Sequence, residues 1–120
     1  MPIVDIYYKF QTDALIDTIR WIKFQNQEAK FWEDRQGPHL YEGKVAALYV
    51  SDRMEVEFFV YGANGQGCTM SVEVQKLEAL TPNEPTYTPT GNRVKLETDP
   101  ISDTVKGSTC FHEKVYKILF

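Results

Sequence analysis

The sequence lacks two features: a long apolar run and a cluster of basic residues. No apolar segment approaches the roughly 20 residues that a membrane-spanning helix needs. The 13 lysines and arginines are spread along the chain and are outnumbered by 17 acidic residues, so the net charge is −4. Because nucleic acids and anionic membranes are bound through clustered lysine and arginine, we expect neither nucleic acid nor membrane as a partner.

Cysteine is also scarce, since the chain holds only Cys68 and Cys110. They could form one disulfide only if the fold brought them together. The first residues, Met1-Pro2-Ile3, show neither the basic start nor the apolar core of a signal peptide. We therefore expect reduced thiols and a cytoplasmic location.

The composition is typical of one folded domain. Hydrophobic residues make up 42% of the chain and charged residues 25%, and aromatic residues are plentiful at 13%. Large rings bury much area each, so a chain of 120 residues can form a stable core. We expect a single domain over residues 1–120. Residues 81–92 hold three prolines and no periodicity, which predicts a loop, or at most an edge segment.

Runs of β-branched and aromatic residues predict strands. The expected strands cover residues 3–10, 44–51, 54–61, 68–76, 93–98 and 108–120. Alternation is clearest in 54–61, where Met54, Val56, Phe58 and Val60 share one face. The glycine-rich segment 62–67 predicts a hairpin turn that joins 54–61 to 68–76.

Between the first two strands the sequence predicts a helix. Thr12 is a suitable N-cap, and Gly37-Pro38 would end a helix that runs from about residue 13 into the thirties. The expected fold class is therefore α+β. It consists of one N-terminal helix packed on a mostly antiparallel twisted sheet of about five to six strands.

This helix would have two apolar sides. Leu15, Ile19 and Ile22 form one stripe, which should face the sheet. The other side carries Trp21, Phe24, Phe31 and Trp32. An exposed aromatic patch of that kind predicts an interface. Two alternatives place these rings in the core instead: a helix that breaks at residues 25–27, or strands at 18–24 and 29–32 joined by a Gln-Asn-Gln turn.

Polar and loop residues offer further candidates for partner binding. Glu55, Glu57 and Glu73 lie on the polar face of the predicted hairpin and could dock a basic partner. Tyr87, which lies between two prolines, could be presented by the loop. The plainer interpretations are a solvated sheet face and a connecting loop stiffened by proline.

No segment carries a complete catalytic, metal or cofactor motif. The glycine-rich segment 62–67 is followed by a strand and lacks the Lys-Ser/Thr pair of a phosphate loop. Cys110 and His112 would share a strand face, but no third orienting group can be named. The set Cys68, Cys110, His39 and His112 has zinc-binding side chains without the usual paired spacing. We expect no catalytic residue, metal or cofactor.

The sequence favours a non-catalytic protein-binding module, such as an inhibitor, an immunity-type protein or an accessory subunit. This module would bind another protein through the aromatic helix face and the acidic sheet face. Three alternatives remain open. They are a small-molecule pocket between helix and sheet, a small enzyme that uses Cys110 and His112, and a homo-oligomer.

Overall fold

Strands with alternating burial make up most of the structure, a computed structural model that describes residues 3–79 and 86–120. In β6 (Arg53–Tyr61), Met54, Val56, Phe58 and Val60 are fully buried, and the residues between them are less buried. β1 (Ile3–Thr12) and β7 (Gly67–Ala79) alternate in the same way over much of their length. A period of two is what a strand with one buried face requires.

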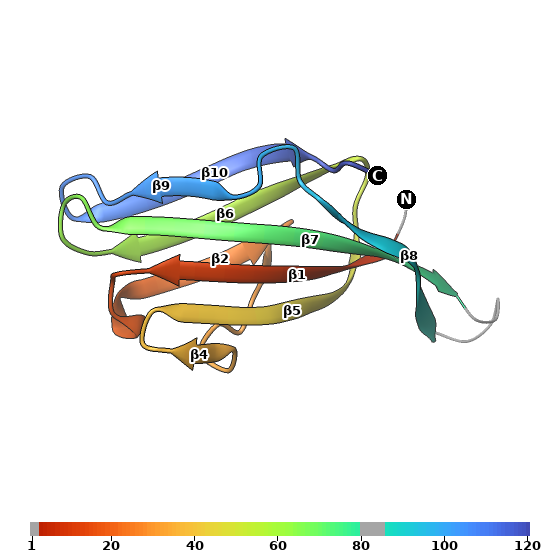
Figure 1. The fold of residues 1–120 in the computed structure, drawn as a ribbon, viewed down its shortest axis with the longest axis horizontal. Coiled ribbons are helices and arrows are strands. Elements are labelled where there is room, and N and C mark those ends of the chain that lie inside the picture. Colours follow the sequence, from red (N-terminus) through yellow and green to blue (C-terminus); the bar gives the residue numbers. More distant parts are fainter. Residues whose placement is uncertain (1–2, 80–85) are drawn as a thin grey trace.

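The strands form two antiparallel sheets that lie face to face (Figure 1). The first sheet has the order β4-β5-β1-β7-β8, and β9 also pairs with β7. It includes β4 (Arg35–Gly37), β5 (Leu40–Tyr49), β8 (Tyr87–Lys95) and β9 (Ile101–Thr104). The second sheet has the order β10-β6-β2-β3, with β2 (Ile19–Phe24), β3 (Gln27–Glu28) and β10 (Thr109–Lys117).

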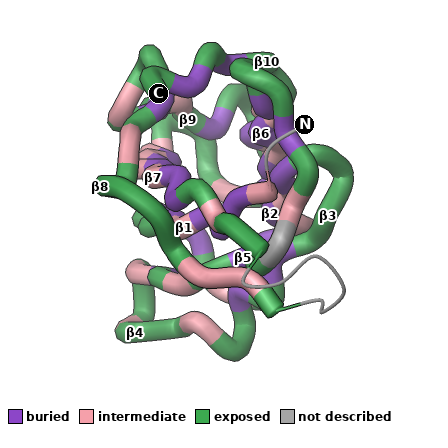
Figure 2. Tube along the Cα trace, turned by 90° about the vertical axis from the view of Figure 1, so that its right-hand side faces the viewer, coloured by how far each residue is buried: buried purple, intermediate pink, exposed green. Residues whose placement is uncertain are grey.

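The core fills the space between the two sheets. Buried positions from both sheets gather on the inside of the molecule (Figure 2). The ring of Phe10 on β1 lies 5.2 Å from that of Phe58 on β6, so aromatic contacts join the sheets. The largest fully buried side chains include Tyr8, Tyr41, Tyr116, Phe10, Phe24 and Phe58. Aromatic burial therefore supplies much of the hydrophobic stabilisation.

The predicted N-terminal helix is wrong, and with it the α+β fold class. The single helical segment in the described part of the chain is one 3₁₀ turn, η1 (Ile16–Thr18). Gln25 and Asn26 have positive φ angles of 51° and 66° and form the tight turn between β2 and β3. In β2, Ile22 and Phe24 point inward and Lys23 between them is less buried, which is a period of two. The fold is nearly all β.

The predicted hairpin between residues 54–61 and 68–76 is also wrong, although both strands exist. β6 pairs with β10 and β2 in the second sheet, whereas β7 pairs with β1, β8 and β9 in the first. The glycine-rich connection crosses between the sheets, and the Gly62 N–H donates to the Ser108 carbonyl at 2.9 Å. β6 pairs only with strands that are distant in sequence, whereas β7 pairs with the distant β1 and also with β8, the next strand along the chain.

The molecule is elongated, with extents of 50 × 26 × 21 Å. The far ends of β7 and β8 run out beyond the rest of the first sheet (Figure 1). Of the predicted loop 81–92, residues 87–92 belong to β8, which lies at an edge of its sheet, and residues 81–85 lie outside the described residues. No helix within residues 3–79 and 86–120 has the length and apolarity to cross a bilayer.

Candidate functional site

Four aromatic rings meet on the outward face of the second sheet. This aromatic cluster consists of Trp21, Phe59, Tyr61 and Phe111. Phe59 is its centre, with ring centroids 5.1 Å from Trp21, 5.0 Å from Tyr61 and 5.4 Å from Phe111. Phe111 is 49% exposed and Tyr61 is 37% exposed. The cluster is therefore open to a partner.

Strand register brings these rings together. Phe59 on β6 is the Cα partner of Phe111 on β10 and of Trp21 on β2. Side chains directly opposite one another on neighbouring strands project from the same face of a sheet. Phe58, next in the chain, points into the core, so Phe59 must point outward.

Two cations already lie over rings of the cluster. The Arg20 guanidinium carbon is 4.8 Å from the centre of the Tyr61 ring, and the Lys23 ammonium is 4.6 Å from that of Trp21. These are cation–π distances, at which the negative face of the ring attracts the charge. Two rings of the cluster therefore already carry a cation of this chain on one face.

Three carboxylates converge beside the aromatic cluster. This carboxylate cluster consists of Glu55, Glu57 and Glu113, each with an oxygen that lies within 4.8 Å of the others. Glu57 and Glu113 are register partners, and each lies two residues from a ring of the aromatic cluster. Like charges at this separation repel one another, so the cluster attracts a cation. Elsewhere among the described residues, no three Cys, His, Asp or Glu side chains come as close.

A shallow depression extends the apolar surface at the end of the sheet. It has a volume of about 290 Å³ and is lined by residues that include Leu15, Thr18 and Tyr61. The Leu15 side chain is 67% exposed. Aromatic and aliphatic groups therefore continue from Phe111 across the sheet to the loop before η1.

The structure brings together only some of the residues that the sequence predicted for partner binding. Trp21, Glu55 and Glu57 lie on the outward face of the second sheet, as described above. Phe24 and Phe31 are buried, so the aromatic stripe 21–32 is not one surface. Four members of the two clusters are not among the predicted site residues, namely Phe59, Tyr61, Phe111 and Glu113. The sequence did contain a signal for Phe111 and Glu113. Two residues apart in the predicted strand 108–120, they must lie on the same side of that strand.

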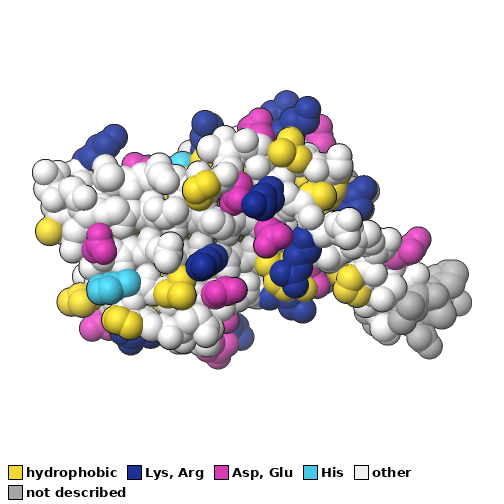
Figure 3. All heavy atoms as spheres, viewed as in Figure 1, with side chains coloured by type: hydrophobic (Ala, Val, Ile, Leu, Met, Phe, Trp, Pro, Cys, Tyr) yellow, Lys and Arg dark blue, Asp and Glu magenta, His cyan; other side chains and the backbone are white. Residues whose placement is uncertain are grey.

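The remaining predicted residues are scattered. Trp32 is exposed in the connection between β3 and β4, where its ring contacts Phe31. Glu73 lines a depression on the first sheet together with Tyr7 and Arg93, whose guanidinium lies 3.6 Å from the Tyr7 ring centre. Tyr87 begins β8. The face of the molecule in Figure 3 shows acidic, basic and hydrophobic side chains interspersed, without one dominant patch.

His112 does not activate the Cys110 thiol. Its Nδ1 lies 3.3 Å from Asp103 Oδ2, and its Nε2 lies 2.8 Å from the Tyr116 hydroxyl, so both ring nitrogens are engaged. Burial, followed by the neighbouring Cys68, raises the pKa of Cys110 to about 12. The thiol therefore stays protonated near neutral pH, and this geometry does not make a thiolate nucleophile.

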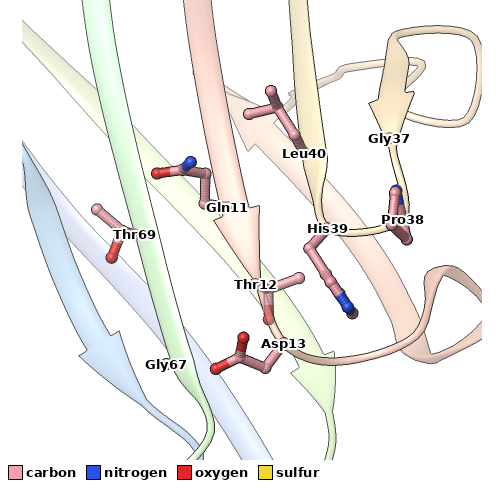
Figure 4. Close-up of a pocket in the computed structure, with 9 residues that line it drawn as sticks. All are labelled: Gln11, Thr12, Asp13, Gly37, Pro38, His39, Leu40, Gly67 and Thr69. Carbon is pink, nitrogen blue, oxygen red and sulfur yellow. The ribbon is translucent and has the colours of Figure 1, made fainter.

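The four side chains considered as zinc ligands do not come together as one set. His39 lies between β4 and β5, in a depression of about 460 Å³ whose lining also includes Asp13 and Thr69 (Figure 4). The one group of three or more potential ligands in the described ranges contains no cysteine and no histidine. The depression is open to solvent, and its lining is largely polar or backbone.

No protein-family model matches the chain, and no curated protein or solved structure matches it either. Function therefore has to be inferred from the surface itself.

Proposed function

We propose that this protein is a non-catalytic protein-binding module that uses the outward face of the second sheet. Its partner would present arginine or lysine side chains beside apolar ones. One observation carries the proposal: an open aromatic cluster adjoins a carboxylate cluster on the same sheet face. An inhibitor, an immunity-type protein and an accessory subunit all belong to this class.

The two clusters recognise the same kind of group in two ways. Aromatic rings attract cations, with about 0.5–1 kcal/mol at exposed sites and about 2 kcal/mol when water is excluded. The carboxylates of Glu55, Glu57 and Glu113 would form charge-assisted hydrogen bonds to the same side chains. Aromatic residues are also enriched at the centres of protein interfaces. A net charge of −4 would speed the approach of a basic partner.

A different protein fits this surface better than a second copy of the chain. In a two-fold symmetric dimer the same patch meets itself, so the carboxylate clusters would be brought close to one another. That repulsion opposes self-association through this face. The proposal also includes a cytoplasmic location, where the resting glutathione pool would favour the thiol form in which Cys68 and Cys110 stand in the structure.

Affinity capture with two matched variants tests the proposal. Phe111→Ala removes a ring that is 49% exposed at the rim of the aromatic cluster, and Trp32→Ala removes a ring that is 54% exposed elsewhere. We expect the wild-type protein and Trp32→Ala to retain the same partner from a lysate of the source, and Phe111→Ala to lose it. Circular dichroism would verify that both variants are folded.

Salt dependence gives a second readout on the isolated complex. Glu57→Gln should weaken binding and reduce its dependence on sodium chloride, because one charge pair is removed. If Phe111→Ala and Trp32→Ala retain the same proteins in equal amounts, the second sheet is not the binding surface. A complex that contains only this chain would replace the proposal with self-association.

A further inference from the structure

The only two cysteines of the chain lie side by side in the core. Cys68 is near the start of β7 in the first sheet, and Cys110 is near the start of β10 in the second. Both are buried and both are free thiols. Across the space between the sheets, Cys68 lies near enough to Cys110 to raise the pKa of its thiol.

Contacts of neighbouring residues place the two cysteines at the same level along the two facing sheets. Cys68 is the Cα partner of Asp103 on β9. The Asp103 carboxylate reaches His112 at 3.3 Å, and His112 follows Cys110 by two positions on the same side of β10. On the other side of Cys68, the Thr12 hydroxyl lies 3.5 Å from its sulfur. Strand pairing and side-chain contacts therefore both bring residues 68 and 110 together.

We propose that Cys68 and Cys110 are a redox modification site, at which an intramolecular disulfide links the two sheets. A small-molecule disulfide such as oxidised glutathione is the oxidant. When this edge of the two sheets is open to water, one protein thiolate attacks the oxidised glutathione, which gives a mixed disulfide and releases one glutathione thiolate. The second cysteine then displaces the other glutathione, so the S–S bond forms, the two protein thiols lose their protons, and two glutathione thiols carry the electrons.

The chain offers no competing cysteine, so within one molecule this pairing is the single possible one. Access is the kinetic obstacle, because both sulfurs are buried. Oxidation of the native protein would therefore require this edge of the two sheets to open. An equilibrium experiment that begins from the unfolded chain removes this obstacle and tests the geometry alone.

The experiment is refolding in glutathione redox buffers, followed by acid quenching, alkylation and intact mass measurement. The product is identified by the loss of two hydrogen atoms without a glutathione adduct. The ratio of disulfide to dithiol gives the effective concentration of one thiol at the other. We expect this concentration to be at least about 100-fold higher under native conditions than in concentrated guanidinium chloride, because the fold holds the thiols together.

Two single variants serve as controls. Cys68→Ser and Cys110→Ser can form only glutathione adducts or linked dimers, and near-ultraviolet circular dichroism shows whether each is folded. An effective concentration under native conditions no higher than in denaturant would overturn the proposal. So would a folded product that carries only glutathione adducts. Either result leaves the second-sheet binding surface untouched.

Discussion

Gly43 on β5 is predicted to be required because the Asp34 carboxylate occupies the place of its missing side chain. A Cβ at position 43 would overlap with Asp34 Cγ and Asp34 Oδ2. The same Oδ2 accepts a hydrogen bond from the buried Tyr8 hydroxyl at 2.6 Å. The Asp34 backbone is fixed, since its carbonyl accepts the Glu42 N–H at 3.0 Å. In Gly43→Ala the carboxylate must therefore rotate away from Tyr8.

The size of the effect follows from two opposing terms. Leaving the Tyr8 hydroxyl buried without its partner costs about 1–3 kcal/mol. Replacing glycine by alanine in a strand contributes about 0.5–1 kcal/mol in the other direction, because the unfolded chain loses entropy. Gly43→Ala should thus lower the free energy of unfolding by about 0.5–2 kcal/mol. In an Asp34→Ala background the hydrogen bond is already absent, so the same change should raise it by about 0.5–1 kcal/mol.

Urea unfolding of the wild type, the two single variants and the double variant measures all four free energies. The reversal of sign is the decisive result, and it corresponds to a coupling energy of about 1–3 kcal/mol between positions 34 and 43. An equal effect of Gly43→Ala in both backgrounds would refute the reasoning. It would mean that the carboxylate of Asp34 is not held over Gly43.

Three further predictions concern the core, the buried thiol and the β2–β3 turn. Phe58→Ala should lower the free energy of urea unfolding by about 3–5 kcal/mol, whereas Phe59→Ala, on the outward face, should lower it by only about 1–2 kcal/mol. Equal losses would contradict the assignment of the two faces. Burial raises the pKa of Cys110 from 9.0 to about 12, so the folded protein holds the thiol proton more tightly than the unfolded chain does. The stability that the protonated thiol contributes is therefore complete below pH 9 and is lost as pH rises towards 12. Cys110→Ala should therefore reduce the fall in urea midpoint over this range, and an unchanged pH profile would refute this. Asn26 has a φ of 66°, so Asn26→Ala should lower the free energy of urea unfolding by about 1 kcal/mol. If this position were helical, the same substitution would raise that free energy.

Strands and their faces could be predicted from the sequence because alternation is a local property. Met54, Val56 and Phe58 were expected on one face of a strand, and all three are buried in β6. Strand partners could not be predicted in the same way. β6 and β7 are neighbours in sequence but belong to different sheets, since β10 and β2 flank one and β1, β8 and β9 flank the other. Pairing depends on residues far apart in the chain, which local patterns do not contain.

The helix was predicted because residues 15–32 fit two periods at once. Leu15, Ile19 and Ile22 fit a spacing of about 3.6, whereas Ile22 and Phe24 fit a spacing of two. The turn at Gln25 and Asn26 determines which of the two periods the chain adopts. Gln25 accepts the Glu55 N–H with its side-chain oxygen at 2.7 Å and donates its own N–H to the Glu55 carbonyl at 3.0 Å. These bonds to β6 stabilise two residues with positive φ, which a helix would not tolerate.

The candidate site depends on the same non-local pairing. Glu57 and Phe59 follow one another on one strand face, so the sequence alone could place a carboxylate beside a ring. Phe111 and Glu113 join them only because β10 pairs with β6 in the register that sets 111 opposite 59 and 113 opposite 57. A shift of that register by one residue would turn Phe111 and Glu113 to the other side of the sheet and break up both clusters. The proposed binding surface is therefore a property of the pairing of β6 with β10, and it forms only in the folded chain.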